Sequence, residues 1–275
     1  MKKSVKLEII AVVLLAILLI LGSYIVLIKA PDTLVNDSYE ITNSKIPADF
    51  NGFKIGFFSD LCLDDEDDLE ILEKTVDKLN QQNYDIVLFG GDLYYDDIFA
   101  QERVEELLAS IHANYGKFAV LGEKDLVTNT DTTMILTLGE FEVLKDQVIP
   151  IYYNDASIAL VGLESEINID TIVPEAYYSS YKLVLVHTPD TYLASNNEDS
   201  TNSIDLQLSG HSHGGYVYLP FVDIADKRVG AKTYVHGKYD VNLSSIIVSN
   251  GANKEPDVRL RLFCSPDIIT VTLKS

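Results

Sequence analysis

The sequence has few cysteines and few basic residues, and each shortage excludes a class of protein. Only two cysteines, Cys62 and Cys264, occur in 275 residues, too few for the disulfide framework of a small secreted domain. Whether they pair is open at this stage. Lysine and arginine number 21 against 42 acidic residues. An acidic surface keeps a domain soluble and repels a phosphate backbone, so we expect no nucleic-acid partner.

Charge is missing altogether from one long segment, Ile9 to Ile28. Its length suits a helix that crosses the roughly 30 Å hydrocarbon layer of a membrane. A cleaved signal peptide is the alternative, but its apolar region normally has only about 7 to 15 residues. Three lysines precede the segment and Lys29 alone follows it closely. This bias predicts a single-pass protein of the cell membrane with a cytoplasmic N-terminus and an extracytoplasmic main domain.

The rest of the chain reads as one large domain after a short connector. We assign residues 1–30 to the membrane anchor, 31–48 to a connector with a first strand, and 49–275 to the domain, whose apolar content suffices for a sizeable core. Strands and helices alternate in its first half, whereas the second half has strands with little helix between them, which predicts two packed sheets flanked by helices. The predicted strands are 38–42, 54–58, 86–89, 118–121, 158–163, 183–186, 205–208, 217–219, 233–235, 245–248, 258–262 and 268–273, and the predicted helices 69–79 and 104–111.

Polar side chains with metal-binding chemistry follow several of these apolar runs. In an α/β fold such strand ends meet at one edge of the sheet, where ligands bind. Aspartate, histidine and cysteine together are typical ligands of transition metals, and a pair of ions needs a carboxylate that can bridge them. Asp92 is the natural bridge, because Gly90 and Gly91 before it allow close approach. The spacing of Asp60 with Cys62, like that of the two histidines at 211 and 213, predicts donors that point the same way from extended backbone.

These clusters resemble, in order, the motif set of calcineurin-like metallophosphoesterases, and most closely that of a membrane-anchored bacterial branch. The resemblance covers roughly residues 38 to 273 and is carried by motifs spaced along the whole domain. It implies a four-layer α/β/β/α sandwich with two mixed sheets, preceded by one transmembrane helix. The motifs are residues 58–62 (FSDLC), 91–93 (GDL), 122–125 (GEKD), 187–189 (HTP) and 210–215 (GHSHGG).

The resemblance also implies a site and an activity. It implies two divalent ions, of manganese, iron or zinc, and the hydrolysis of a phosphoester by a metal-bound hydroxide outside the cytoplasm. The ester could be a monoester or a diester, including a lipid-linked one. Carried over by position, the first ion would be held by Asp60, Cys62, Asp92 and His213, and the second by Asp92, Glu123, His187 and His211.

Three positions depart from the family pattern, which has His, Asn and His where this chain has Cys62, Glu123 and Lys124. A thiolate is softer than imidazole and favours zinc or iron, and Glu123 adds a negative charge. Lys124 can attract phosphoryl oxygens, but with an ordinary pKa near 10.4 it is a poor proton donor. Loss of a general acid typically costs about 10² to 10⁴ in rate.

Two other interpretations of these positions remain. The chain could be a catalytically impaired relative that binds metal or a phosphorylated ligand without turnover. Alternatively, Cys62 is only a small buried residue, and Glu123 with Lys124 a surface ion pair.

Overall fold

Two six-stranded sheets form the centre of the protein, which is described by a computed structural model over residues 3–127, 132–164, 169–195, 203–218, 227–258 and 260–275. The strand order is β1-β12-β2-β3-β4-β5 in the first sheet and β10-β11-β9-β8-β7-β6 in the second. The strands of the first sheet are β1 (Val35–Thr42), β2 (Lys54–Phe58), β3 (Ile86–Phe89), β4 (Lys117–Ala119), β5 (Glu142–Val143) and β12 (Asp267–Lys274). Those of the second are β6 (Gln147–Tyr153), β7 (Ala156–Leu163), β8 (Lys182–Val186), β9 (Leu206–Ser209), β10 (Gly237–Val241) and β11 (Ser244–Val248).

Both sheets are mixed, as the sequence predicts. In the first sheet only the pairing of β12 with β2 is antiparallel, and in the second only the two edge pairings, β10 with β11 and β6 with β7, are antiparallel. Strands β2, β3 and β4 therefore run in one direction, as do β7, β8, β9 and β11. Loops that leave these parallel strands emerge at the same edge of their sheet.

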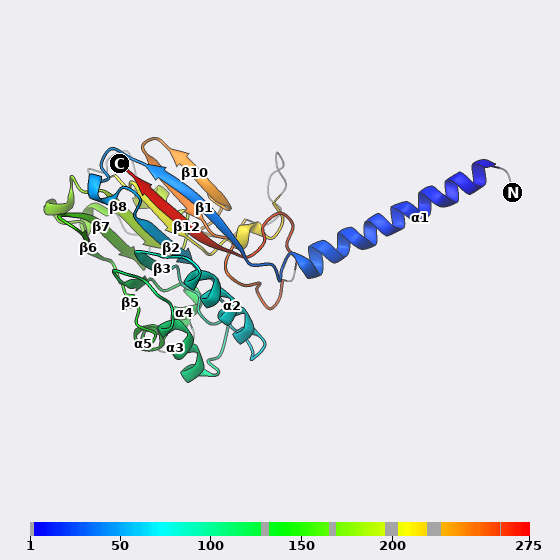
Figure 1. Ribbon diagram of the computed structural model, residues 1–275, viewed down its shortest axis with the longest axis horizontal. Helices are drawn as coiled ribbons and strands as arrows, with labels where there is room; N and C mark the ends of the chain where they lie inside the picture. The colour runs from blue at the N-terminus through cyan, green and yellow to red at the C-terminus, as the bar shows by residue number, and fades with distance from the viewer. Residues whose placement is uncertain (1–2, 128–131, 165–168, 196–202, 219–226, 259) are drawn as a thin grey trace.

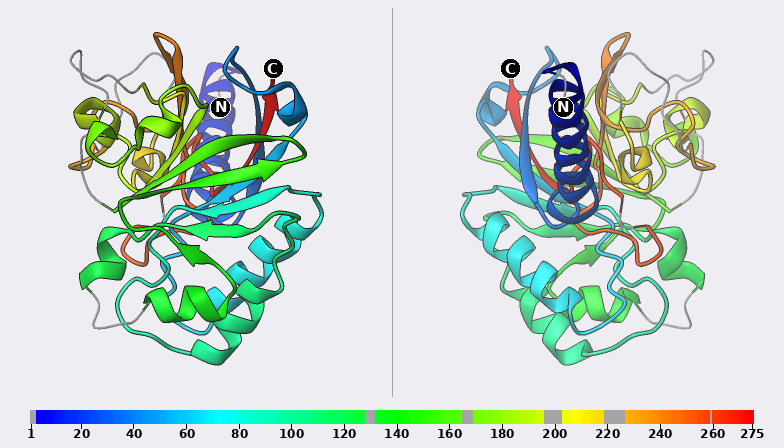
Figure 2. Two further views of the ribbon diagram at one scale, coloured as in Figure 1. Left: turned by 90° about the vertical axis from the view of Figure 1, so that its left-hand side faces the viewer. Right: turned by 90° about the vertical axis from the view of Figure 1, so that its right-hand side faces the viewer.

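Helices cover the outer faces of the sheets and complete four layers. On the first sheet lie α2 (Asp68–Asn80), α3 (Gln101–Ala109) and α5 (Thr132–Leu138), and α4 (Glu123–Val127) follows β4 (Figure 1 and Figure 2). Beside the second sheet are α6 (Thr191–Ser195) and three 3₁₀ turns, Ile169–Thr171, Glu175–Tyr177 and His213–Gly215; another turn, Ala48–Phe50, precedes β2. Helix α2 shows why these segments form helices that cover the sheet. Its residues Leu72, Val76 and Leu79 recur at helical spacing, and all three are buried against the sheet.

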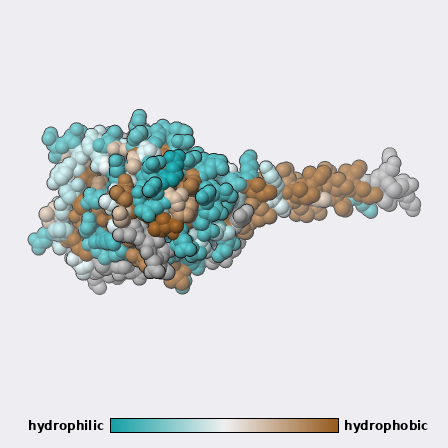
Figure 3. Space-filling model, turned by 90° about the horizontal axis from the view of Figure 1, so that it is seen from below, coloured by the Kyte–Doolittle hydropathy of each residue, from teal (hydrophilic) through white to brown (hydrophobic). Residues whose placement is uncertain are grey.

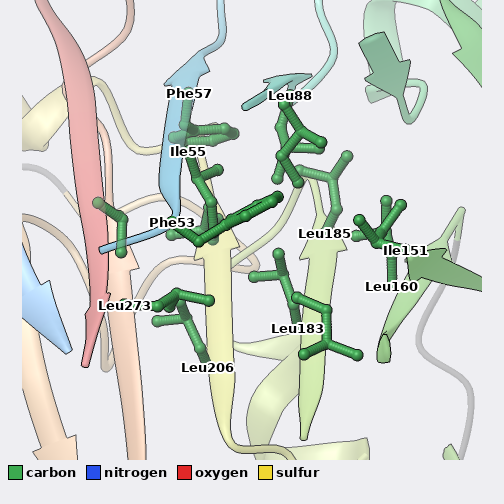
Figure 4. Packing of buried hydrophobic residues seen from close by; sticks show 14 of the residues in the cluster. Phe53, Ile55, Phe57, Leu88, Ile151, Leu160, Leu183, Leu185, Leu206 and Leu273 are labelled. Atoms are coloured by element: carbon green, nitrogen blue, oxygen red, sulfur yellow. The ribbon is translucent and has the colours of Figure 1, made fainter. Parts of the chain in front are cut away.

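A layer of apolar side chains fills the space between the two sheets (Figure 4). Phe57 and Leu88 come from the first sheet, and Leu160, Leu185 and Leu206 from the second. All of these side chains are fully buried, and each contributes about 1.5–3 kcal/mol by leaving water. This core fixes how the two sheets meet, and thereby how the loops at their ends meet.

An apolar helix projects from this domain (Figure 3). Helix α1 (Lys3–Tyr24) continues as a π-helical turn, Ile25–Lys29. The segment Glu8–Lys29 is long and apolar enough to cross a membrane, with a mean hydropathy of 3.1 and none of it buried against the domain. At its end the carbonyl of Val26 accepts a hydrogen bond of 3.2 Å from the backbone of Arg261.

The predicted helices and strands agree best with the structure where a strand is buried on both faces. Strands 54–58 and 86–89 have the predicted bounds, and most other predicted strands and both helices match within a few residues. Three predictions are wrong: 217–219 and 258–262 contain only isolated bridges, and 233–235 is irregular; residues 219 and 259 lie outside the described ranges. The predicted connector is also part of the first sheet, since β1 pairs with β12 along its whole length.

Candidate metal centre

The predicted donors converge where the parallel strands of the two sheets end. Asp60 follows β2, Asp92 follows β3 and Glu123 begins α4 after β4. From the second sheet His187 follows β8, and the histidines of the 210–215 motif follow β9. Three groups of donors have all their atoms within 4.8 Å of one another: Cys62, His213 and Glu255; Glu123, His187 and His211; and Asp60, Asp92 and His187.

One group is centred on His187 and His211. Nε2 of His187 lies 3.4 Å and Nδ1 of His211 2.8 Å from Oε2 of Glu123. The opposite ring nitrogens face backbone carbonyls: His187 Nδ1 lies 2.7 Å from the carbonyl of Gly90, and His211 Nε2 2.8 Å from that of Val229. Since a carbonyl only accepts, the proton of each neutral ring sits on the carbonyl side. This is the usual arrangement of a histidine that ligates metal through its other nitrogen.

The second group contains Cys62 and His213, both wholly buried. Nε2 of His213 lies 3.6 Å from Oδ1 of Asp60 and also 3.6 Å from Oε1 of Glu255. Nδ1 of the same ring is 3.1 Å from a guanidinium nitrogen of Arg261. Arginine only donates, so Nδ1 accepts and the proton of the neutral ring sits on Nε2. A cation bound at Nε2 would therefore displace a proton.

Asp60 and Asp92 lie between the two groups. Asp92 Oδ2 is 3.3 Å from Nε2 of His187, and its Oδ1 accepts a hydrogen bond of 3.0 Å from the backbone of Lys124. The carboxylate of Asp60 accepts the backbone N–H of His211 at 3.0 Å. Both carboxylates are at most 1% exposed. Asp92 thus reaches the group centred on His187 and His211, and its place beside Asp60 suits a bridging role.

The backbone of the donors is left-handed, which corrects the predicted extended geometry. Five of them have positive φ: Asp60 (53°), Cys62 (43°), Asp92 (60°), His211 (67°) and His213 (48°). Residues other than glycine take this conformation at a cost, and such residues cluster at functional sites. The spacing of two residues was therefore a valid signal of proximity, but the donors converge through turns and not through the pleat of a strand.

Two glycines of the motifs are explained by close approach. A Cβ at Gly122 would overlap Oδ1 of Asp92, and one at Gly210 would overlap Oδ2 of Asp60. Neither glycine has a left-handed φ, so the requirement is for space and not for backbone freedom. Any side chain here would displace a carboxylate of the site.

Burial and crowding shift the pKa values of the site in opposite directions. Burial would lower the pKa of His187, but the nearby negative charge of Asp92 outweighs this and raises it well above its ordinary value. Burial would raise the pKa of Glu123, but the close approach of His187 and His211 outweighs this and lowers it. Burial next to Asp92 raises the pKa values of both Asp60 and Cys62. The site therefore attracts positive charge.

Three buried ring nitrogens face this acidic centre without a hydrogen bond to any described residue: Nε2 of His187, Nδ1 of His211 and Nε2 of His213. Buried polar atoms normally have a partner, so three such atoms in one place indicate a ligand. The side chain of Glu123 is 47% exposed, whereas the three imidazoles are at most 6% exposed. Glu123 is therefore the most exposed of these side chains.

Lys124 lies at the border of the site. Its Nζ is 3.7 Å from the centre of the Tyr95 ring and 3.7 Å from Oε1 of Glu255. The side chain is 19% exposed, so it is neither free in solvent nor part of the core. Glu123 faces His187 and His211, and Lys124 faces Glu255.

Sequence reasoning missed Glu255 and the side chains around it. Arg228 and Tyr216 both hydrogen-bond to Glu255 Oε2, and Arg228 Nη1 donates to Oε1 over 2.9 Å. Arg261 is fully buried and hydrogen-bonds to the carbonyl and ring of His213. The available signal was an excess of charged residues in the predicted strand 258–262 and just before it. The two cysteines do not pair, and both are free and buried.

The match to a family model decides the classification. Residues 53–215 match the model described as calcineurin-like phosphoesterase. The chain belongs to this family. The resemblance seen in the sequence is thereby confirmed, and the chain is a metallophosphoesterase, a member of a family of phosphoester hydrolases that use divalent metal ions.

Similar proteins share most of the length of this metallophosphoesterase. YkuE of Bacillus subtilis, named as a metallophosphoesterase, is 29% identical over 254 residues, which cover 89% of this chain and 87% of YkuE. The phosphodiesterase YaeI of Escherichia coli is 26% identical over 231 residues, covering 80% of this chain and 82% of YaeI. A protein of Danio rerio named as a transmembrane protein with a metallophosphoesterase domain is 23% identical, covering 98% of this chain and 63% of its own length.

Proposed function

We propose that this metallophosphoesterase hydrolyses a phosphomonoester or phosphodiester with two divalent cations, at a site outside the cytoplasm. The observation that carries the proposal is the set of three buried imidazole nitrogens that face Asp60, Asp92 and Glu123. No single pair of an imidazole and a carboxylate would require a ligand. Together the three imidazoles and three carboxylates form one acidic site, in which only Glu123 is substantially exposed.

The spacing of the donors fits bound cations. Metal–ligand bonds of about 2.1 Å at a tetrahedral angle separate the donor atoms by about 3.4 Å. The His187 nitrogen lies 3.3 Å from the Asp92 carboxylate and 3.4 Å from that of Glu123, and the His213 nitrogen lies 3.6 Å from that of Asp60. Asp60, Cys62, Asp92 and His213 would hold the first cation, and Asp92, Glu123, His187 and His211 the second.

The chemistry divides between the cations and the chain. Bound divalent cations supply Lewis acidity, which lowers the pKa of water and withdraws charge from phosphoryl oxygens. Asp92 keeps the two groups of donors at a fixed separation. The backbone carbonyls behind His187 and His211 fix which nitrogen of each ring faces inward. Lys124, at the exposed border, attracts the phosphoryl oxygens and orients the ester.

A second candidate function follows from Lys124 alone. Its amine is a weak acid at neutral pH, so protonation of the leaving oxygen has no efficient donor at this position. A protein with intact cation sites and such a replacement could bind a phosphorylated ligand and release it unchanged. The two functions share every other residue of the site.

Assays of the full-length protein in detergent separate the two. Metal content would be measured per chain, and turnover of p-nitrophenyl phosphate and bis-p-nitrophenyl phosphate with Mn²⁺, Zn²⁺ or Fe²⁺. Bound metal with turnover supports the hydrolase. Bound metal without turnover, together with activity in a C62H/E123N/K124H variant, supports the binding protein. Less than one ion per chain in the wild type would contradict both.

The proposed side of the membrane rests on the lysines around α1. Three precede the span and Lys29 alone follows it closely, which favours a cytoplasmic N-terminus. A periplasmic-type reporter and a cytoplasmic-type reporter, each fused after Ser275, would test this in intact cells. Activity of only the cytoplasmic reporter would show that the domain lies inside.

A further inference from the structure

Glu255 reaches the site from a loop that none of the family motifs includes. It lies after β11, beyond the match to the family model, which ends at residue 215. The loop folds back on itself through an isolated bridge between Glu255 and Val258. This fold places a carboxylate, only 4% exposed, beside donors that precede it by more than forty residues.

One oxygen of this carboxylate, Oε1, faces the group formed by Cys62 and His213, and it also accepts a hydrogen bond of 2.9 Å from Nη1 of Arg228. Oε1 of Glu255 lies 3.6 Å from Nε2 of His213, and both lie within 4.8 Å of the Cys62 sulfur. The His213 nitrogen is buried and has no hydrogen-bond partner among the described residues. A separation of 3.6 Å between two donors agrees with the roughly 3.4 Å that two ligands of one tetrahedral ion show.

The other oxygen of Glu255, Oε2, is oriented by hydrogen bonds. Tyr216 and Arg228 both donate hydrogen bonds to Oε2, and Tyr216 stacks on the ring of His213 at 5.9 Å between centroids. Such partners orient a ligating carboxylate in the same way that carbonyls orient ligating histidines.

We propose that Glu255 is a ligand of the first cation, in one set with Cys62 and His213. The inference rests on the proposed function, because it requires a cation in that site. A thiolate, an imidazole and a carboxylate are all donors that zinc accepts.

Cobalt titration of the full-length protein in detergent tests the assignment. Co²⁺ bound to a thiolate absorbs in the near ultraviolet, and its visible bands report coordination number. We expect E255Q to weaken binding of one of two ions at least about tenfold and to alter the visible bands while the thiolate band remains. E255D, which keeps the charge but shortens the side chain, should weaken the same ion. D257N removes an exposed carboxylate of the same loop and should leave both ions unchanged.

The outcomes separate this inference from the proposed function. Two ions bound by E255Q with wild-type affinity and spectrum would overturn the role of Glu255 and leave the dinuclear site intact. A wild type that binds one ion, which E255Q loses, would support Glu255 and contradict the dinuclear site. A wild type that binds none would overturn both. If E255Q does not fold, the cobalt affinities of E255D and D257N are compared. Weaker binding of one ion by E255D alone supports the role of Glu255, and equal affinities overturn it.

Discussion

A guanidinium nitrogen of Arg261 lies 3.1 Å from Nδ1 of His213, inside the domain and away from solvent. The same side chain donates to the carbonyl of Asn250 over 3.1 Å and to that of Asn253 over 2.8 Å. Its backbone N–H meets Val26 at the end of the membrane helix. One arginine therefore holds the loops of the site together and ties them to the anchor.

Replacement of Arg261 by methionine should destabilise the protein by at least about 3 kcal/mol, because several buried carbonyls lose their donor. Thermal unfolding of the full-length protein in detergent measures this. The conservative variant R261K should recover only part of the loss, since an ammonium cannot reach three loops at once. R103M, at an exposed position of α3, is the control. Equal melting temperatures of R261M and R103M would contradict the structural role.

Replacement of Lys124 by histidine should raise kcat by about 10² or more, because an imidazole can protonate the leaving oxygen near neutral pH. The pH profile of kcat should gain a limb that falls as the new imidazole loses its proton. The control is K74H, on the exposed face of α2. If kcat of K124H equals that of the wild type, or falls, the lysine is itself the suitable group and the impaired-enzyme hypothesis loses its basis.

Replacement of Cys62 by histidine should shift the preference of the site from zinc or iron toward manganese, because imidazole is a harder ligand than thiolate. Burial beside Asp92 raises the pKa of the Cys62 thiol, so cation binding must release its proton. Competition between Zn²⁺ and Mn²⁺ measures the preference, and a pH indicator in weak buffer measures the released proton. C264S changes the other buried cysteine and should have no effect. An unchanged metal preference in C62H would show that the sulfur is not a ligand.

Asp267 gives the fold a pH dependence that is independent of the site. Burial raises its pKa from 3.8 to about 7, although hydrogen bonds from Ser249 and Asn250 oppose the shift. The folded state therefore binds a proton that the unfolded state releases, so this contribution to stability is complete below pH 3.8 and is lost as the pH rises toward 7. We expect the free energy of unfolding of D267N to fall less steeply with rising pH than that of the wild type, by up to about 1.4 kcal/mol per pH unit.

Urea unfolding of wild type and D267N in detergent between pH 5 and pH 8 measures the effect. D240N, at an exposed position of β10, provides the matched control. Parallel stability curves for wild type and D267N across this range would show that Asp267 ionises in the folded protein as readily as in the unfolded chain.

The sequence alone was sufficient for the features that local pattern controls. The uncharged run before Lys29 predicted the apolar helix, because length and hydropathy alone decide whether a helix can span a bilayer. Strands 54–58 and 86–89 were predicted with their bounds, because a strand buried on both faces is apolar throughout. Asp60, Asp92 and His187 were predicted as neighbours, because each follows a parallel strand of the central sheets.

Only the tertiary structure decided the role of the loops in the second half of the chain. Residues 258–262 were predicted as a strand from their apolar content, yet the described residues 258 and 260–262 take part only in isolated bridges, and Arg261 lies against His213. Glu255 carries no local sign of its role, since one carboxylate in an acidic chain is unremarkable until Arg228 and Tyr216 fix its orientation. Such contacts join residues that are distant in sequence, and no periodicity along the chain encodes them.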